Sequence, residues 1–108
     1  MAQDFRNDIQ RNVGTTPQLL LDAGNYDAVI GIRCCNVHAS STIALDVYIE
    51  NSGDHYIAKD VSIPPNSAIE LIQGGAKIVL ESGDVLKAVS DVASSVDIVT
   101  SFIDTISS

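Results

Sequence analysis

The chain has 108 residues and a mass of 11.4 kDa, enough for one hydrophobic core without disulfides or metal ions and too little for two. Six Lys and Arg residues against fourteen Asp and Glu residues give a formal net charge of -8, which argues against nucleic acid or a membrane surface as the main partner. The sequence contains no uninterrupted apolar run of about 18 residues and no hydrophobic secretory segment after Met1, so we expect the protein to remain where it is made.

The first fourteen residues differ in pattern from the rest of the chain. Phe5, Ile9 and Val13 are spaced four residues apart with charged residues between them, which predicts a weak amphipathic helix. A helix this short is marginal on its own in water. We therefore expect residues 1–14 to be an N-terminal arm, which either packs on something such as a neighbouring subunit or stays loose. Its two Arg and two Asp residues cancel, so the net charge of -8 lies in residues 15–108.

The remaining residues, 15–108, have the pattern of β-structure. The whole chain contains 13 Ile, 11 Val and 5 Thr residues, and such β-branched side chains favour strands over helices. The clearest period-two alternation of apolar and polar residues runs from Thr42 to Glu50. Turn residues divide this region into eight strand candidates: Gln18–Asp22, Ala28–His38, Thr42–Glu50, His55–Ile63, Ala68–Ile72, Lys77–Glu81, Val85–Ser90 and Val96–Ile103.

The connections between these candidates are short. Asn51–Asp54 is predicted to be a tight hairpin in which Gly53 is available for a positive φ. Pro64 and Pro65 cannot donate to a ladder, so the chain is expected to leave its sheet there, at an edge or at a crossing between sheets. No connection is long enough for the helical crossovers of a parallel sheet. The sequence therefore predicts an all-β domain, an antiparallel β-sandwich of jelly-roll or immunoglobulin-like type.

The two cysteines are adjacent, at Cys34 and Cys35. Neighbouring residues on a strand point to opposite faces, so a disulfide between them would need unusual backbone geometry. We expect two buried thiols that act as small apolar side chains, a usage that suits a reducing cytoplasm.

Few residues have the pattern of a catalytic site. Ser40 and Ser41 follow His38 closely, but they lack the Gly-x-Ser-x-Gly elbow that exposes a nucleophile. Cys34 and His38 are four residues apart on one predicted strand, about 13 Å at the usual rise, too far for a thiolate pair. We therefore expect a protein that is not an enzyme.

Metal and phosphate sites are also weakly indicated. Asp54, His55 and Asp60 carry groups that ligate metals, but turn chemistry favours Asp54 as a hairpin residue and His55 as an exposed residue at a strand edge. Gly74 and Gly75 lie between two predicted strands and precede no helix, which indicates a turn and not a phosphate cradle. No cofactor is expected.

Three tyrosines, Tyr26, Tyr48 and Tyr56, offer the main aromatic surface. No basic groove accompanies them, which argues against single-stranded nucleic acid. Tyr48 falls on the predicted wet face of its strand, and tyrosine is favoured where one side of a side chain is buried and the other hydrated. We therefore expect Tyr48 to be a contact residue.

Several segments together resemble the small virion structural proteins of tailed bacteriophages, in particular myophages of marine cyanobacteria. The resemblance covers nearly the whole chain, and its more specific part is the order of a polar strand, Ile-Pro-Pro-Asn-Ser, an apolar strand, Gly-Gly and Lys-Ile-Val-Leu-Glu-Ser-Gly-Asp. The segments are Phe5–Arg6, Arg11–Thr16, Ala28–Ile32, Asn36–Val37, Ile43–Ile49, Tyr56–Pro64, Lys77–Leu86 and Ala93–Asp97.

This resemblance implies a non-enzymatic particle component: a capsid decoration protein, or an accessory of the neck, tail or baseplate. It implies a virion location after synthesis in the host cytoplasm, other virion proteins as partners, and a homo-oligomer in the particle. The expected partner contacts are Phe5, Ile9 and Val13 of the arm, with Tyr48 and Tyr56. The alternative is a host-facing carbohydrate- or ligand-binding β-sandwich module that uses Tyr48, Tyr56 and His55.

Overall fold

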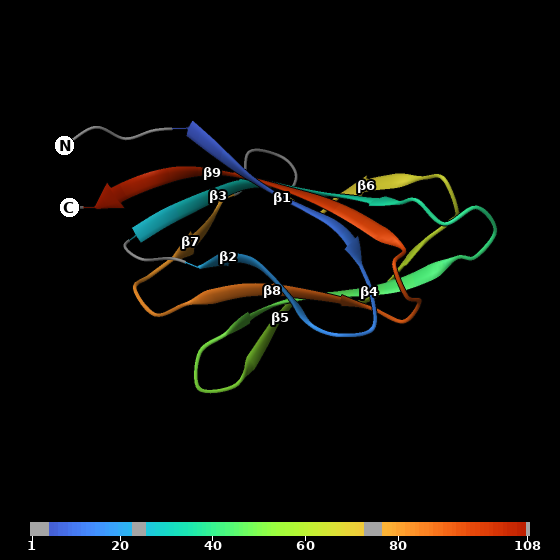
Figure 1. Cartoon of the computed structure of the whole chain (residues 1–108). Helices are drawn as coiled ribbons and strands as arrows, with labels where there is room; N and C mark the ends of the chain where they lie inside the picture. Colours follow the sequence, from blue (N-terminus) through green and yellow to red (C-terminus); the bar gives the residue numbers. More distant parts are fainter. Residues whose placement is uncertain (1–4, 23–25, 73–76, 108) are drawn as a thin grey trace.

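A computed structural model describes residues 5–22, 26–72 and 77–107 (Figure 1). This part of the chain is all-β and contains two antiparallel sheets packed face to face. Its strands are β1 (Phe5–Val13), β2 (Gln18–Asp22), β3 (Tyr26–Asn36), β4 (Ile43–Glu50), β5 (Asp54–Ile63), β6 (Ala68–Glu70), β7 (Ile78–Leu80), β8 (Val85–Ser90) and β9 (Val96–Ser107).

The sheets have the topology of a jelly roll. The first sheet, which we call sheet A, has the order β1-β9-β3-β6, with β7 also pairing with β3, and the second, sheet B, has the order β2-β8-β4-β5. The strand pairs are therefore nested, as if one long hairpin had been rolled up: β1 pairs with β9, β2 with β8, β3 with β6 and β7, and β4 with β5. The predicted antiparallel β-sandwich is confirmed, and of its two suggested forms the strand order is that of the jelly roll.

All eight predicted strands are present, with bounds that differ by a few residues. Their alternation places one face of each sheet in a shared core, because apolar side chains at every second position point inward. The largest fully buried side chains come from both sheets: Leu20, Ile32, Ile43, Leu45, Ile63, Leu80, Leu86 and Ile98.

The helical prediction for the N-terminal region is wrong. Residues 5–13 form strand β1, which pairs with β9 along sheet A from Phe5 opposite Ile103 to Val13 opposite Val96. A strand thus occupies residues that were expected to form a separate arm, and β1 is an integral part of the sandwich. Pairing with a long neighbouring strand outweighed a helical pattern that had only three apolar residues to support it.

Two predicted turns have the expected geometry. In the β4–β5 hairpin, Ser52 and Gly53 have φ values of 52° and 138°, conformations that favour small residues. After Pro64 and Pro65 the chain passes from β5, at one edge of sheet B, to β6 in sheet A, as predicted for a crossing between sheets. Residues 23–25, which separate two of the predicted strands, and the predicted turn at Gly74 and Gly75 lie outside the described residues.

Candidate interaction surface

Strand β1 has its apolar side chains on the outside of the sandwich. The polar side chains of the strand lie on the inner face of sheet A, because they are opposite buried residues of β9: these are Arg6, Asp8 and Gln10. Phe5 and Ile9 lie on the outer face, opposite half-buried residues of β9. Phe5 and Ile9 are 77% and 64% exposed. This arrangement reverses the usual alternation, in which the apolar residues of a strand face the core.

The neighbouring strands continue this apolar surface across sheet A. One cross-strand row runs from Phe5 through Ile103 and Ala28 to Val79, which is 53% exposed. A second row, on the same face, begins with Ile9 and Val99 and continues with the charged residues Arg33 and Glu70, so its apolar part is limited to β1 and β9. We call these residues, together with Ile30 of the β3 bulge, the outer-face patch: Phe5, Ile9, Ile30, Val79, Val99 and Ile103.

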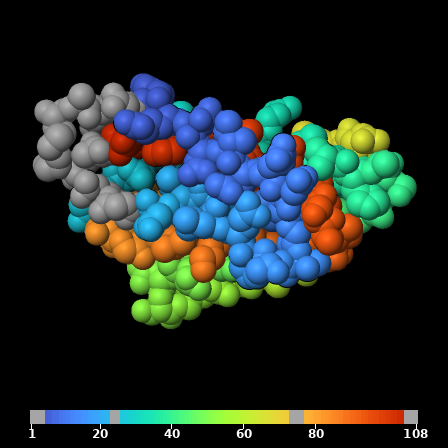
Figure 2. Space-filling view, in the orientation of Figure 1, coloured from blue at the N-terminus to red at the C-terminus, as the bar shows by residue number. Residues whose placement is uncertain are grey.

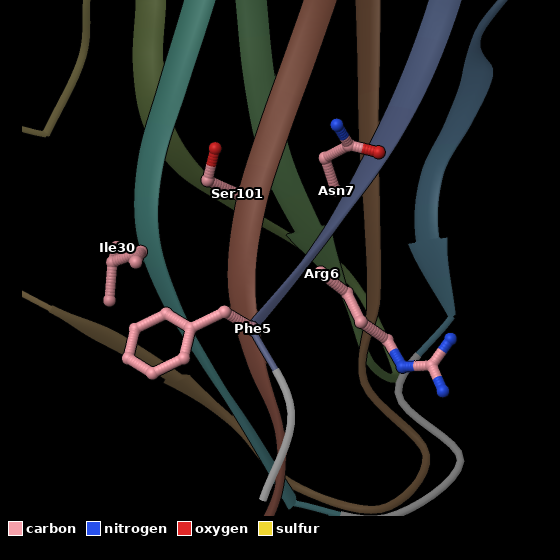
Figure 3. Close-up of a pocket in the computed structure, with 5 residues that line it drawn as sticks. All are labelled: Phe5, Arg6, Asn7, Ile30 and Ser101. Atoms are coloured by element: carbon pink, nitrogen blue, oxygen red, sulfur yellow. The ribbon is translucent and has the colours of Figure 1, made fainter.

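A shallow hollow of about 580 Å³ lies at one end of the outer-face patch. Phe5, Arg6, Asn7, Ile30 and Ser101 line it. Figure 3 shows the Phe5 ring directed towards Ile30 on one side of the strands, while the Arg6 side chain extends to the other side. There the Nε atom of Arg6 forms an ion pair with the Oδ2 atom of Asp104 at 2.9 Å. The hollow is open to solvent and mixes apolar and polar walls, which suits a protein side chain better than an enclosed small molecule.

Of the predicted contacts on β1, two are on the surface and one is not. Phe5 and Ile9 belong to the outer-face patch, but Val13 is fully buried in the core. The reason is a β-bulge between Gln10 and Val13, where Asn12 has a positive φ of 59°. The extra residue shifts the alternation and turns Val13 inward. The expectation that Val13 contacts a partner is therefore wrong.

Tyr48 is also not a surface residue. It lies on the outer face of sheet B as predicted, but it is only 5% exposed, because the Tyr56 ring packs against it with a centroid distance of 5.4 Å. Burial raises the pKa of Tyr48, and the carboxylate of Asp54 adds to the rise. Tyr56 is 47% exposed, and the Nζ atom of Lys59 lies 4.6 Å from its ring centroid. The outer face of sheet B therefore has a compact, cation-covered tyrosine pair and not an open aromatic platform.

Ion pairs surround this tyrosine pair. Lys59 Nζ lies 3.4 Å from Asp46 Oδ2, and Lys87 Nζ lies 3.0 Å from Glu50 Oε1. A hydrogen bond to the partner carboxylate raises the pKa of each lysine. Both pairs join neighbouring strands of sheet B, so they act as cross-strand links on the solvent face.

The cysteines and His38 have surroundings that fit a structural role. Both thiols are free; Cys34 is buried in the core and Cys35 is half-buried on the opposite face. Burial raises the pKa of the Cys34 thiol to about 12, so it is not a ready nucleophile. The Nδ1 atom of His38 accepts hydrogen bonds from the backbone N–H groups of Ser40 and Ser41, at 3.2 and 3.0 Å. His38 thus holds its own loop instead of activating a serine hydroxyl.

The predicted metal-ligand candidates are placed as their turn chemistry suggests. Asp54 begins β5 beside the hairpin, and His55 follows it as an exposed residue on this edge strand. Among residues 5–22, 26–72 and 77–107, no group of three or more His, Cys, Asp or Glu residues is placed to hold a metal ion. The same described ranges contain no helix that could cross a membrane.

Sequence reasoning missed Asn36, a fully buried polar residue at the end of β3. Its Nδ2 atom donates to the carbonyl oxygens of Ser41 and Ile63, at 2.9 and 2.8 Å, and its Oδ1 atom accepts from the N–H of His38 at 2.9 Å. One side chain thus joins the β3–β4 loop to the end of β5. Only the three-dimensional structure brings these backbone groups together.

No protein-family model, curated protein or solved structure matches this chain.

Proposed function

We propose that this chain is a non-enzymatic structural component of a tailed-phage virion, in which it makes repeated protein–protein contacts as a capsid decoration protein or as an accessory of the neck, tail or baseplate. The observation that carries the proposal is the reversed alternation of β1. A strand that points Phe5 and Ile9 outward and Arg6 and Asp8 inward gives up apolar burial in the isolated domain. A protein partner that covers the outer-face patch recovers this burial.

The jelly-roll topology is compatible with this role, since the fold occurs in viral capsid proteins. It also occurs in lectins, so the fold by itself does not choose between the two functions. The surface favours the structural role over carbohydrate binding. Tyr48, on which a sugar-binding site would depend, is buried, and Lys59 lies over Tyr56. The outer-face patch supports a structural role more strongly than the tyrosine pair supports carbohydrate binding.

Mass spectrometry of purified particles, separated into heads and tails, tests the proposal directly. We expect the chain at a fixed copy number in one of the two fractions. Absence from both fractions would refute a structural role in the virion. Saturable binding of the isolated chain to glycans, combined with absence from particles, would support the carbohydrate-binding alternative.

Point substitutions then test which surface makes the contact. Ile9→Lys places a charge in the outer-face patch, and Leu19→Lys is the matched control, because Leu19 is 46% exposed on the outer face of sheet B. Both side chains are exposed, so neither change removes a core contact. We expect Ile9→Lys to lower incorporation into particles by about tenfold or more and Leu19→Lys to leave it unchanged. Equal effects would show that the outer-face patch is not the contact surface.

A further inference from the structure

The free side of β1 is an open sheet edge. In the described part of the chain β1 pairs with β9 alone, so the N–H and C=O groups on its other side have no strand beside them. Figure 2 shows β1, in dark blue, in full view along one side of the molecule next to the lighter blue β2. From Phe5 to Gln10 the register with β9 is unbroken, which makes this segment a regular template for another strand.

The other long edge strand, β5, is less regular. Its pairing with β4 has two register shifts, and Asp60 has a positive φ of 53°. The backbone N–H of Asp60 donates to the side chain of Asp46 at 2.7 Å. Bulges and charges of this kind are common protections against edge-to-edge pairing. On β1 the bulge comes only after Gln10, so the first six residues of the strand contain no bulge, and their charged residues are Arg6 and Asp8.

We propose that β1 pairs antiparallel with β1 of a second copy of this chain, with Asn7 opposite Asn7 of the partner subunit on the two-fold axis. In this register Phe5 lies opposite the partner subunit's Ile9 on the outer face. Arg6 lies opposite the partner subunit's Asp8 on the inner face. Each apolar residue thus meets an apolar residue and each charge meets its opposite, and both pairs occur twice by symmetry.

Neighbouring registers lose this complementarity. A shift by one residue would place outer-face side chains opposite inner-face side chains. A shift that puts residue 8 on the axis brings Asp8 opposite Asp8 of the partner subunit, and a shift that puts residue 6 there brings Arg6 opposite Arg6 of the partner subunit. A register centred further along the strand includes the bulge at Asn12. The charge order of β1 therefore selects the Asn7-centred register.

The net charge of β1 is small, so it adds little repulsion when two copies of this edge pair. The strand has two Arg residues and one Asp residue, whereas the whole chain has a net charge of -8. Arg6 lies 2.9 Å from Asp104, so in the paired state it would sit between this carboxylate and Asp8 of the partner subunit. The pairing would join two copies of sheet A into one sheet and place both Phe5–Ile9 pairs at its centre. This inference goes beyond the proposed function, because it concerns the isolated chain and does not require a virion.

Disulfide trapping tests the register. In a Cys35→Ser background, Asn7→Cys places two thiols on the two-fold axis, where directly opposed Cα atoms are about 4.5–5.5 Å apart, within the range that a disulfide spans. Ile9→Cys is the matched control, because Ile9 and its symmetry mate would be four residues apart along the strands, about 13 Å. We expect oxidation to convert Asn7→Cys to a covalent dimer and to leave Ile9→Cys monomeric. Efficient dimerisation of Ile9→Cys alone, or of neither variant, would overturn the proposal.

Charge exchange provides a second test by sedimentation velocity over a range of concentrations. We expect Arg6→Asp to weaken self-association about tenfold, since it turns two attractions into two repulsions. The double variant R6D/D8R restores opposite charges in the same register, so it is expected to recover most of the loss. A double variant as weak as the single one would refute the pairing. A wild-type chain that is monomeric at all concentrations, yet present in particles, would refute the pairing and leave the proposed function intact.

Discussion

We expect the substitution Asn36→Ala to destabilise the protein more than the substitution of an exposed polar residue by alanine. The change removes three hydrogen bonds of 2.8–2.9 Å, two donated by Nδ2 and one accepted by Oδ1. A buried hydrogen bond contributes about 1 kcal/mol net, so the loss amounts to about 3 kcal/mol. The buried carbonyl oxygen of Ile63 loses the Asn36 donor as well, which adds to this figure rather than subtracting from it.

Urea denaturation measures this loss. A slope of about 1.5 kcal/mol per molar urea would convert 3 kcal/mol into a midpoint shift of about 2 M. Asn51→Ala is the matched control, because the Nδ2 atom of Asn51 also donates a hydrogen bond, to Asp84 Oδ1 at 2.6 Å, but on an exposed hairpin. We expect the control to lose less than about 1 kcal/mol.

The substitution Asn36→Asp keeps the shape and removes the two donors. It places a carboxylate against the carbonyl oxygens of Ser41 and Ile63 in a buried site, so it is expected to be at least as destabilising as alanine. If Asn36→Ala and Asn51→Ala lowered the free energy of unfolding equally, the role assigned to Asn36 as the joint between the β3–β4 loop and β5 would be wrong.

Two further predictions concern alkaline stability and a close backbone contact. Burial raises the pKa of Cys34 from 9.0 to about 12, so the unfolded chain loses this proton at a lower pH than the folded chain does. The free energy of unfolding should therefore fall by about 1.4 kcal/mol per pH unit between pH 9 and 12. In denaturation measured as a function of pH, Cys34→Ala should flatten this slope, and an unchanged slope would exclude Cys34 as the cause. A Cβ on Gly14 would lie 2.9 Å from the backbone nitrogen of Ser94, whereas a Cβ on Gly31 would meet side-chain atoms no closer than 3.6 Å. Thermal unfolding should therefore show that Gly14→Ala lowers the free energy of unfolding by about 1–3 kcal/mol, and that Gly31→Ala changes it much less.

The strands of residues 18–103 could be predicted because their signals are local. Period-two alternation, β-branched side chains and turn residues such as Gly53 act within a few neighbours along the chain. Thr42–Glu50 shows the first two together, and turn residues follow it directly. The prediction that Pro64 and Pro65 end a strand has the same origin, since the missing N–H is a property of the residue itself. These local signals were sufficient for the all-β class and for the sandwich.

Strand β1, the burial of Tyr48 and the role of Asn36 were decided by tertiary structure. Phe5 and Ile9 face away from the core, so the alternation of β1 carries no inward apolar signal, and only pairing with β9 makes it a strand. Tyr48 lies on the wet face by its period, but Tyr56 from the neighbouring strand covers it. In each case the deciding contact comes from outside the strand concerned, and a pattern read along one segment contains no information about which other segment will pack against it.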